Sequence, residues 1–154
     1  MTVPAKILAV DDEPDFELLI KQRFRQRIRK GDLAFRFARH GEEALAALEQ
    51  EPDIGLLLLD INMPVMDGLT LLSELRSRQS PARAVIVSAY GDMANIRTAM
   101  NRGAFDFVTK PVDLNDLEVT IDKTLETIAY VRALQLSGHA TLADVPASER
   151  DKIR

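Results

Sequence analysis

The stretch DIGLLLLDINMPVMDG, residues 53–68, decides how the rest of the chain is interpreted. Its first half is continuously apolar through four leucines, as expected of a central strand that is covered on both faces. The run then ends on a carboxylate, Asp60, and passes into a turn that contains Pro64 and Gly68. A buried strand that stops at a lone acid raises the question of what that acid does.

On both sides of this stretch, short apolar runs alternate with segments of helical spacing. We expect strands at residues 6–10, 33–38, 53–60, 83–89 and 104–110. The first helix is indicated by apolar residues at every fourth position (Phe16, Ile20, Phe24 and Ile28), and further helices are expected at 41–50, 68–78, 92–103 and 114–136. This alternation predicts an α/β fold: a single doubly wound domain with a five-stranded parallel sheet flanked by five helices.

The last predicted helix is extended. Residues 114–136 would form a helix of about 35 Å, longer than a compact domain of this size requires. It either packs on the sheet throughout or projects and pairs with a second copy or another partner. We therefore expect a domain over residues 1–136, and in residues 137–154 a polar tail or the start of a linker to a missing output domain.

Composition narrows the class of protein. The 154 residues carry a net charge of −4 and no cysteine, which excludes disulfides, thiolate metal sites and thiol nucleophiles. The negative charge gives no general attraction to nucleic acid or to an anionic membrane. No stretch approaches the roughly 20 apolar residues that span a bilayer. We expect a cytoplasmic protein that binds neither nucleic acid nor membrane directly.

Chemically active residues follow four of the five predicted strands. In a doubly wound sheet, the functional crevice lies at the carboxyl ends of the strands. The residues found there are Asp11, Asp12 and Glu13 after the first strand, Asp60 after the third, Ser88, Ala89 and Tyr90 at the fourth, and Lys110 at the fifth. If the strand order brings these four strands together, the groups converge on one site.

Taken singly, each group has a simpler structural explanation. Asp11 or Asp12 could cap the first helix, and Asp60 could begin a turn. Ser88 could bond its own backbone, and Lys110 could be a solvated strand end.

Taken together, converging carboxylates would repel one another and raise one another's pKa. Lys110 supplies one positive charge, and a hard divalent cation would supply the rest. Oxygen ligands favour Mg²⁺, with Mn²⁺ as the alternative ion, over zinc or copper. Neither histidine of the chain falls at one of these strand ends.

A carboxylate beside bound Mg²⁺ is a nucleophile for phosphoryl transfer and can take the group as an acyl phosphate. Lys110 and the Ser88 hydroxyl can hold the phosphoryl oxygens, and the small Ala89 lets its backbone N–H approach them. This chemistry predicts that Asp60 is the phosphoryl acceptor.

The same residues resemble the receiver domain of two-component response regulators, the CheY-like family, over about residues 6–128. The resemblance rests on the acidic pair after the first strand, DINMPVMDG after the third, SA after the fourth and KP after the fifth. It implies that Asp60 is phosphorylated. It also implies that Asp12, with Asp11 partly through water, binds Mg²⁺ together with Asp60 and the backbone carbonyl of Asn62.

Further roles follow from the resemblance. Ser88 would be the switch hydroxyl, Lys110 would contact the phosphoryl group, and the bond from Lys110 to Pro111 would be cis. Phe107 stands where the family has an aromatic residue that turns inward on activation, although plain core packing is the alternative. Phe16 and Leu19 lie where family members meet their kinase.

Two positions are expected to tune the phosphoryl lifetime. Asn62 and Tyr90 each lie two residues past a key group. A bulky Tyr90 would obstruct the water that attacks the acyl phosphate. An unchanged dephosphorylation rate in Tyr90→Ala would refute this hypothesis.

The predicted function is a signalling switch. A sensor histidine kinase or a histidine phosphotransfer protein would phosphorylate Asp60 and alter a surface of the helix at 92–103, the fifth strand and the last helix. The domain would catalyse only its own phosphorylation and dephosphorylation, so it is not an enzyme with an external substrate.

Two other protein classes fit less well. A phosphatase of the haloacid-dehalogenase type wants a second aspartate where Asn62 stands, and no cap domain fits in this length. A flavodoxin-like nucleotide binder lacks its Gly-rich loop after the first strand. For the output, the chain is either a stand-alone receiver or a fragment of a longer regulator with a catalytic domain such as a PP2C-type phosphatase or a nucleotide cyclase.

Overall fold

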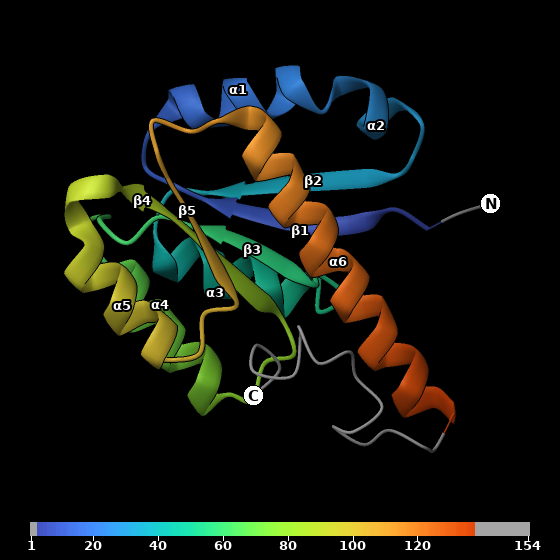
Figure 1. The fold of residues 1–154 in the computed structure, drawn as a ribbon. Coiled ribbons are helices and arrows are strands. Elements are labelled where there is room, and N and C mark those ends of the chain that lie inside the picture. The colour runs from blue at the N-terminus through green and yellow to red at the C-terminus, as the bar shows by residue number, and fades with distance from the viewer. Residues whose placement is uncertain (1–2, 138–154) are drawn as a thin grey trace.

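Five parallel strands form one sheet in the order β2-β1-β3-β4-β5 (Figure 1). The computed structural model describes residues 3–137, apart from the side chain of Tyr90, so the predicted tail or linker at 138–154 lies outside the described residues. The strands are β1 (Ala5–Val10), β2 (Leu33–Ala38), β3 (Leu56–Leu59), β4 (Arg83–Ala89) and β5 (Asp106–Lys110). Every neighbouring pair is parallel, as predicted.

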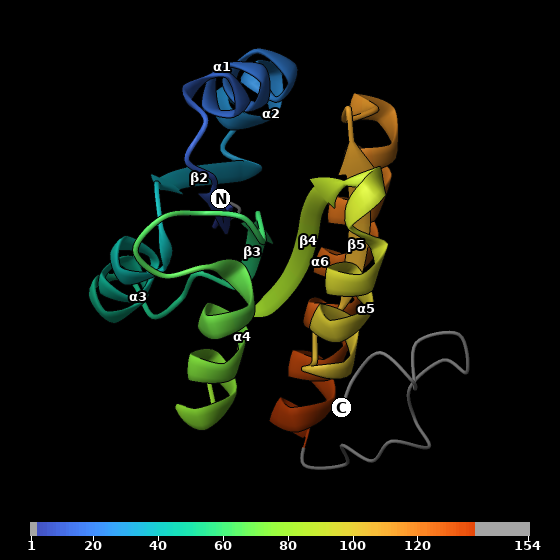
Figure 2. The ribbon, with the colours of Figure 1, turned by 90° about the vertical axis from the view of Figure 1, so that its left-hand side faces the viewer.

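Helices cover both faces of the sheet and give a three-layer α/β fold (Figures 1 and 2). On one face lie α1 (Pro14–Arg23), α2 (Arg25–Arg29) and α6 (Leu114–Ser137). On the other lie α3 (Gly41–Gln50), α4 (Gly68–Ser77) and α5 (Met93–Asn101), with the short 3-10 helix η1 (Tyr90–Asp92) leading into α5. The four leucines of β3 are fully buried between the layers, which confirms a central strand.

The prediction of five helices is wrong by one, because the first helical segment is broken at Phe24. Its dihedral angles, φ −102° and ψ 14°, leave the helical range and separate α1 from α2. The four-residue spacing continues through the break because the Phe24 N–H still donates to Ile20 and the Ile28 N–H donates to Phe24. Phe24 is buried, with its ring centroid 5.3 Å from that of Phe35 on β2.

The last helix is extended as predicted, with 24 residues. Its sheet-facing side buries Leu117 and Ile121 and continues with Thr124, whose hydroxyl donates to the Thr120 carbonyl at 2.7 Å. That bond satisfies the hydroxyl inside the core, so a threonine interrupts the apolar pattern without interrupting the packing.

An ion-pair network ties the first two helices to the last one. Arg27 contacts Glu118 at 3.0 Å and Asp122 at 2.9 Å, and Arg23 contacts Glu118 at 3.0 Å. Arg23 and Arg27 are therefore structural residues that hold the last helix in place. Among residues 3–137, no helix combines the length and the apolar composition that a membrane span requires.

Candidate functional site

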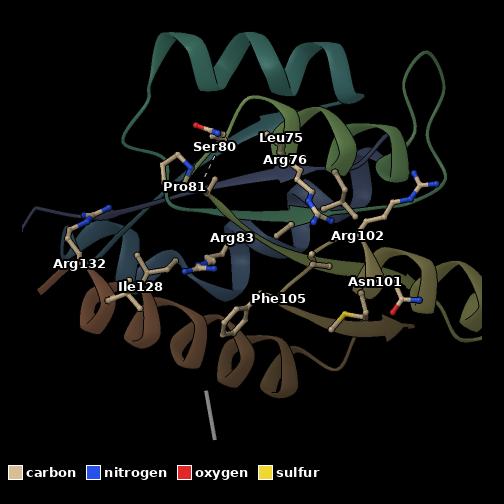
Figure 3. A pocket seen from close by; sticks show the side chains of 18 of the residues that line it. Leu75, Arg76, Ser80, Pro81, Arg83, Asn101, Arg102, Phe105, Ile128 and Arg132 are labelled. Atoms are coloured by element: carbon tan, nitrogen blue, oxygen red, sulfur yellow. Dashed lines mark hydrogen bonds between the residues drawn. The ribbon is translucent and has the colours of Figure 1, made fainter. Parts of the chain in front are cut away.

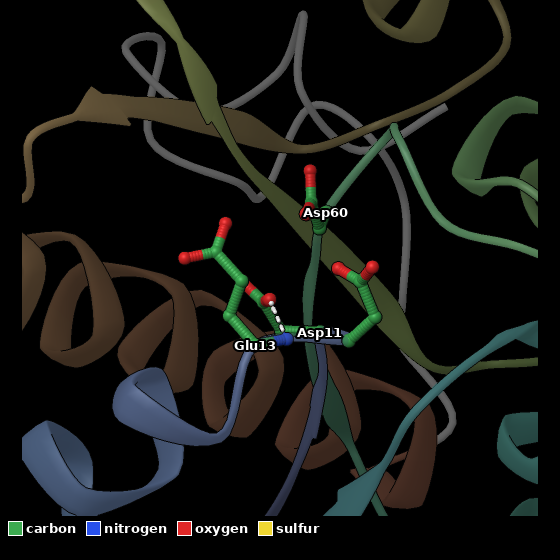
Figure 4. A group of neighbouring side chains, drawn as sticks. Asp11, Glu13 and Asp60 are labelled. Carbon is green, nitrogen blue, oxygen red and sulfur yellow. Dashed lines mark hydrogen bonds between the residues drawn. The ribbon is translucent and has the colours of Figure 1, made fainter.

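Four carboxylates gather at the carboxyl ends of β1 and β3. Asp11, Asp12 and Glu13 follow β1, Asp60 follows β3, and one oxygen from each lies within 4.8 Å of the others. Figure 4 shows Asp11 and Glu13 on the loop after β1 and Asp60 at the end of β3. The pairing of the two strands brings them together, since the Asp60 N–H donates to the Val10 carbonyl at 2.9 Å.

Lys110, at the end of β5, reaches into this cluster. Its ammonium nitrogen lies 2.9 Å from Asp11 Oδ2, 3.5 Å from Asp60 Oδ2 and 3.5 Å from Glu13 Oε1. Burial by itself would lower the pKa of Lys110, but the hydrogen bond and charge of Asp11, with the charges of Asp60 and Glu13, raise it above its ordinary value. The lysine is therefore a permanent cation at neutral pH, and it is not the solvated strand end of the simpler explanation.

The Asp60 side chain is almost completely enclosed, with 6% of the residue exposed. Its Oδ1 accepts the backbone N–H of Asn62 at 3.2 Å. Burial raises the pKa of Asp60, Lys110 opposes this, and the nearby Asp11 raises the pKa further. The result is a buried acid that carries its charge at the expense of stability.

The acids after β1 do not serve as a helix cap. The Asp11 side chain accepts the N–H of Glu13 at 2.8 Å, which forms a local turn before the helix. Pro14 opens α1, and no side chain of the described residues caps this helix. The capping explanation of Asp11 and Asp12 is therefore wrong.

Asp92 was missed in the sequence, yet it connects three segments of the site. Its Oδ2 accepts the Ser88 hydroxyl at 3.3 Å and the side-chain amide of Asn62 at 2.9 Å, while its Oδ1 accepts the amide of Asn95 at 2.7 Å. Ser88 is 1% exposed and does not bond its own backbone, in contrast to the simpler explanation. Asp92 thus holds the end of β4 to the loop after β3.

The geometry of this site agrees with a family match. The family model described as the response regulator receiver domain covers residues 7–122 of the chain. The chain belongs to this family. The haloacid-dehalogenase-type phosphatase and the flavodoxin-like nucleotide binder are thereby excluded as the family of this chain.

Curated relatives and solved structures agree with the assignment. The receiver domain is 34% identical to the chemotaxis protein CheY of Bacillus subtilis over 78% of this chain and 97% of that protein. It is 32% identical to the regulatory protein AtoC of Escherichia coli over 82% of this chain but only 26% of that protein, so it spans about a quarter of that relative. The crystal structure of the receiver domain of NtrX from Brucella abortus matches with a TM-score of 0.70, 32% identity, and coverage of 79% of this chain and 98% of that one.

The remaining predicted site residues take less central positions in this receiver domain. Ala89 is exposed beside Lys110 in the β4–β5 register. Phe107 is 37% exposed and belongs to neither core cluster, so the core-packing alternative is wrong. The Lys110–Pro111 bond is cis, as the resemblance implies. Tyr90 begins η1, but its side chain lies outside the described part of the structure.

The two residues expected to contact the kinase, Phe16 and Leu19, differ in their exposure. Phe16 is only 6% exposed and packs in the core of this receiver domain, so its prediction as a contact residue is wrong. Leu19 of α1 is 43% exposed, so its side chain is accessible and it stays a predicted contact residue; the neighbouring Leu18 is 62% exposed.

The loop after β3 positions Asp60 through Gly68. The Gly68 N–H donates to the Ile61 carbonyl at 2.9 Å, and Asp67 caps α4 by accepting the Thr70 N–H at 2.8 Å. A Cβ on Gly68 would lie 2.5 Å from the Asp60 carbonyl oxygen and 2.8 Å from the Ile61 Cα. Only glycine permits this approach, so the start of α4 is seated directly against the backbone of the acceptor residue.

Proposed function

We propose that the chain is a phosphorylation-dependent switch in which Asp60 accepts a phosphoryl group from a sensor histidine kinase or a histidine phosphotransfer protein. The observation that carries this proposal is the buried Asp60 carboxylate, 3.5 Å from the Lys110 ammonium and next to three further carboxylates. Family membership supports the same chemistry.

The donor set of the site fits a hard divalent cation. In the described part of the chain, four carboxylates face the one ammonium group of Lys110, and an oxygen-only set with excess negative charge suits Mg²⁺, or Mn²⁺, rather than a soft metal. We expect Asp12, Asp60 and the Asn62 carbonyl to bind it, with Asp11 partly through water. When bound, the ion draws charge from the phosphoryl oxygens.

The protein groups divide the work of the transfer. One oxygen of the Asp60 carboxylate forms a bond to phosphorus while the P–N bond of the phosphohistidine breaks, and its electron pair passes to the imidazole nitrogen. Lys110 and the N–H of Ala89 hold phosphoryl oxygens. The Ser88 hydroxyl joins them only after it leaves Asp92, its acceptor at 3.3 Å. Phosphorylation is thereby coupled to the loop that leads into α5.

The phosphoryl group would then be lost by hydrolysis at the same site, without turnover of an external substrate. Asn62 and Tyr90 remain our candidates for setting its lifetime. The Asn62 amide is held by Asp92 at 2.9 Å, which supports a link between this residue and the switch.

The switched surface is proposed to be the face of α5, β5 and α6, with Phe107 as its moving aromatic. Phe107 on β5 and Val119 on α6 expose 37% and 65% of their surfaces, which supports a partner or a second copy of the chain there. We propose residues 1–136 as the receiver unit, a cytoplasmic location, and an output that is either a further domain or a separate target protein. AtoC, of which only 26% is matched, supports a further domain, and CheY, of which 97% is matched, supports a separate target.

The test is the intact mass after incubation with acetyl phosphate and Mg²⁺. We expect one added phosphoryl group on the wild type, none on Asp60→Asn, and none with a chelator. Asp116→Asn is the matched control, since Asp116 is an exposed carboxylate of α6 outside the site. An adduct on Asp60→Asn equal to that on the wild type would refute the proposal. If acetyl phosphate gives no adduct, transfer from a phosphorylated kinase decides, and its failure would also refute it.

A further inference from the structure

A cavity of about 790 Å³ lies at the end of the sheet where β4 begins, opposite to the end that carries Asp60. Figure 3 shows the side chains that line it. It is bounded by the start of β4, the residues just before β5, the C-terminal ends of α4 and α5, and the later turns of α6. No part of the phosphoacceptor site described above contributes to it.

Four arginines line this cavity, and the described residues that line it include no acid. They are Arg76, Arg83, Arg102 and Arg132, all visible in Figure 3. Such a concentration of positive charge is unexpected in a chain of net charge −4. We call this group the arginine cavity.

The guanidinium groups of the arginine cavity lack anionic partners within residues 3–137. Arg102 donates only to neutral groups, the Leu69 carbonyl at 3.1 Å and the Ser73 hydroxyl at 3.3 Å. No carboxylate of the described residues pairs with Arg76, Arg83 or Arg132. Arginines elsewhere do find acids, as Arg36 does with Glu51 at 2.7 Å.

Arg83 is the most informative of the four. It is half-buried at the first position of β4, and burial lowers the pKa of its guanidinium. A charge withdrawn from water without a partner destabilises the fold, and a bound anion would offset that penalty. Arginines at helix C-termini have a simpler use, because they complement the helix dipole. That explanation covers Arg76 and Arg102 but not a residue that begins a strand.

The positive charge is spread over both faces of the sheet. Side chains alternate along β4, and Val85 and Val87 belong to the core cluster on the α6 face, so Arg83 lies on that face with Arg132. Arg76 belongs to α4, and Arg102 follows α5, on the other face. A ligand that satisfies both sides needs more than one anionic group.

We propose that the arginine cavity binds a small molecule that carries two or more phosphate groups. The planar arginine fork matches phosphate oxygens in a bidentate manner, and the cavity has the size of ordinary small-molecule sites. Ser80 and Asn101 add neutral hydrogen-bonding groups, and Ile128 adds an apolar wall. Phe105 is 1% exposed, so its ring face is not offered to a nucleobase, and the phosphates are the recognised part.

Inorganic tripolyphosphate is the probe, titrated calorimetrically into the full chain in metal-free buffer of about 0.15 M ionic strength. We expect saturable binding that weakens about tenfold or more in Arg83→Gln and about threefold or more in Arg132→Gln. Arg78→Gln is the matched control and should change affinity less than about twofold, since Arg78 pairs with Glu74 and Glu49 outside the cavity. Amide NMR shifts should move at residues 79–84 and 101–105.

Four results would overturn the proposal. The first is that tripolyphosphate does not bind saturably to the wild type, and the second is that all three variants weaken its binding equally. The third is that amide NMR shifts move only at residues 11–13, 60–62 and 110. The fourth is that a poly-glutamate peptide binds more tightly than tripolyphosphate, with the same dependence on Arg83. The last would make the arginine cavity a docking site for acidic polypeptide. If Arg83→Gln fails to fold by circular dichroism, the exposed Arg132→Gln decides.

Discussion

Replacing Gly68 by alanine should damage the phosphoacceptor site without touching any side chain in it. The added Cβ would lie 2.5 Å from the Asp60 carbonyl oxygen, whereas ordinary contacts begin at 3.4 Å. The obstacle is backbone, so the start of α4 and the end of β3 would have to separate by about 1 Å. That shift would weaken the hydrogen bond from Gly68 to Ile61, now 2.9 Å long.

The expected loss follows from three contributions. Overpacking costs about 1–3 kcal/mol, and the weakened hydrogen bond adds about 1 kcal/mol. The lower entropy of the unfolded alanine chain returns about 0.4–1 kcal/mol. The net decrease in the free energy of unfolding is about 2 kcal/mol, which lowers the Tm of a domain of this size by about 4–8 °C. Urea and thermal denaturation measure it, and phosphorylation by acetyl phosphate should slow in parallel, since Asp60 moves.

Gly55→Ala is the matched control, because Gly55 lies directly before β3, at the opposite end of that strand from Asp60. Its Cβ would lie 3.9 Å from the Ile128 side chain, which is an ordinary contact. We expect a change within about 1 kcal/mol and a normal phosphorylation rate. If Gly68→Ala were no more destabilising than Gly55→Ala, the contact of α4 with the acceptor backbone would not be the constraint that we infer.

Three further results are expected. Asp92→Ala removes the competing acceptor of the Ser88 hydroxyl, a hydrogen bond worth about 1 kcal/mol, and should therefore speed phosphorylation by acetyl phosphate about fivefold. The control is Asn95→Ala, which loses only a hydrogen bond to the other oxygen of Asp92. Equal phosphorylation rates in the two variants would contradict the competition for the Ser88 hydroxyl. In metal-free buffer, the contribution of Asp60 to stability is complete below the pKa of Asp60 in the unfolded chain, and it is lost as the pH rises through the raised pKa of Asp60 in the folded state. Asp60→Asn should therefore unfold at a higher urea concentration than wild type at about pH 7, and this difference should shrink toward about pH 3. A difference independent of pH would refute this prediction. If phosphorylated copies pair through the exposed face of α6, Val119→Asp should keep the phosphorylated chain monomeric by light scattering, and an unchanged dimer mass would exclude that face.

Local patterns in the sequence were sufficient for the elements themselves. The buried leucines of β3 and the strand–helix alternation predicted the sheet correctly, and the glycine after Asp67 marked the start of α4. The break at Phe24 escaped because apolar residues keep the same spacing on both sides of it. A periodic pattern reports which face is buried, and it does not report whether the backbone stays helical.

Contacts between distant segments were harder to predict. The acids after β1 and β3 were expected to meet, because parallel strands end at the same edge. Asp92 looked like an ordinary helix start, and only the fold brings it to Asn62, thirty positions earlier in the chain. The pairing of Arg27 with Glu118 and the gathering of Arg83 with Arg132 likewise depend on where α6 lies, which no local pattern specifies.

The most direct test of the central claim is to locate the phosphoryl group on the chain. After incubation with acetyl phosphate and Mg²⁺, borohydride reduces an aspartyl phosphate to homoserine, and peptide mass spectrometry identifies the converted residue. We predict conversion at Asp60 alone. Asp11 is also enclosed, but its two oxygens are held by Lys110 at 2.9 Å and by the Glu13 N–H at 2.8 Å, whereas Asp60 Oδ2 has only the longer contact of 3.5 Å with Lys110. Conversion at Asp11 or Asp12, with Asp60 unmodified, would contradict the account.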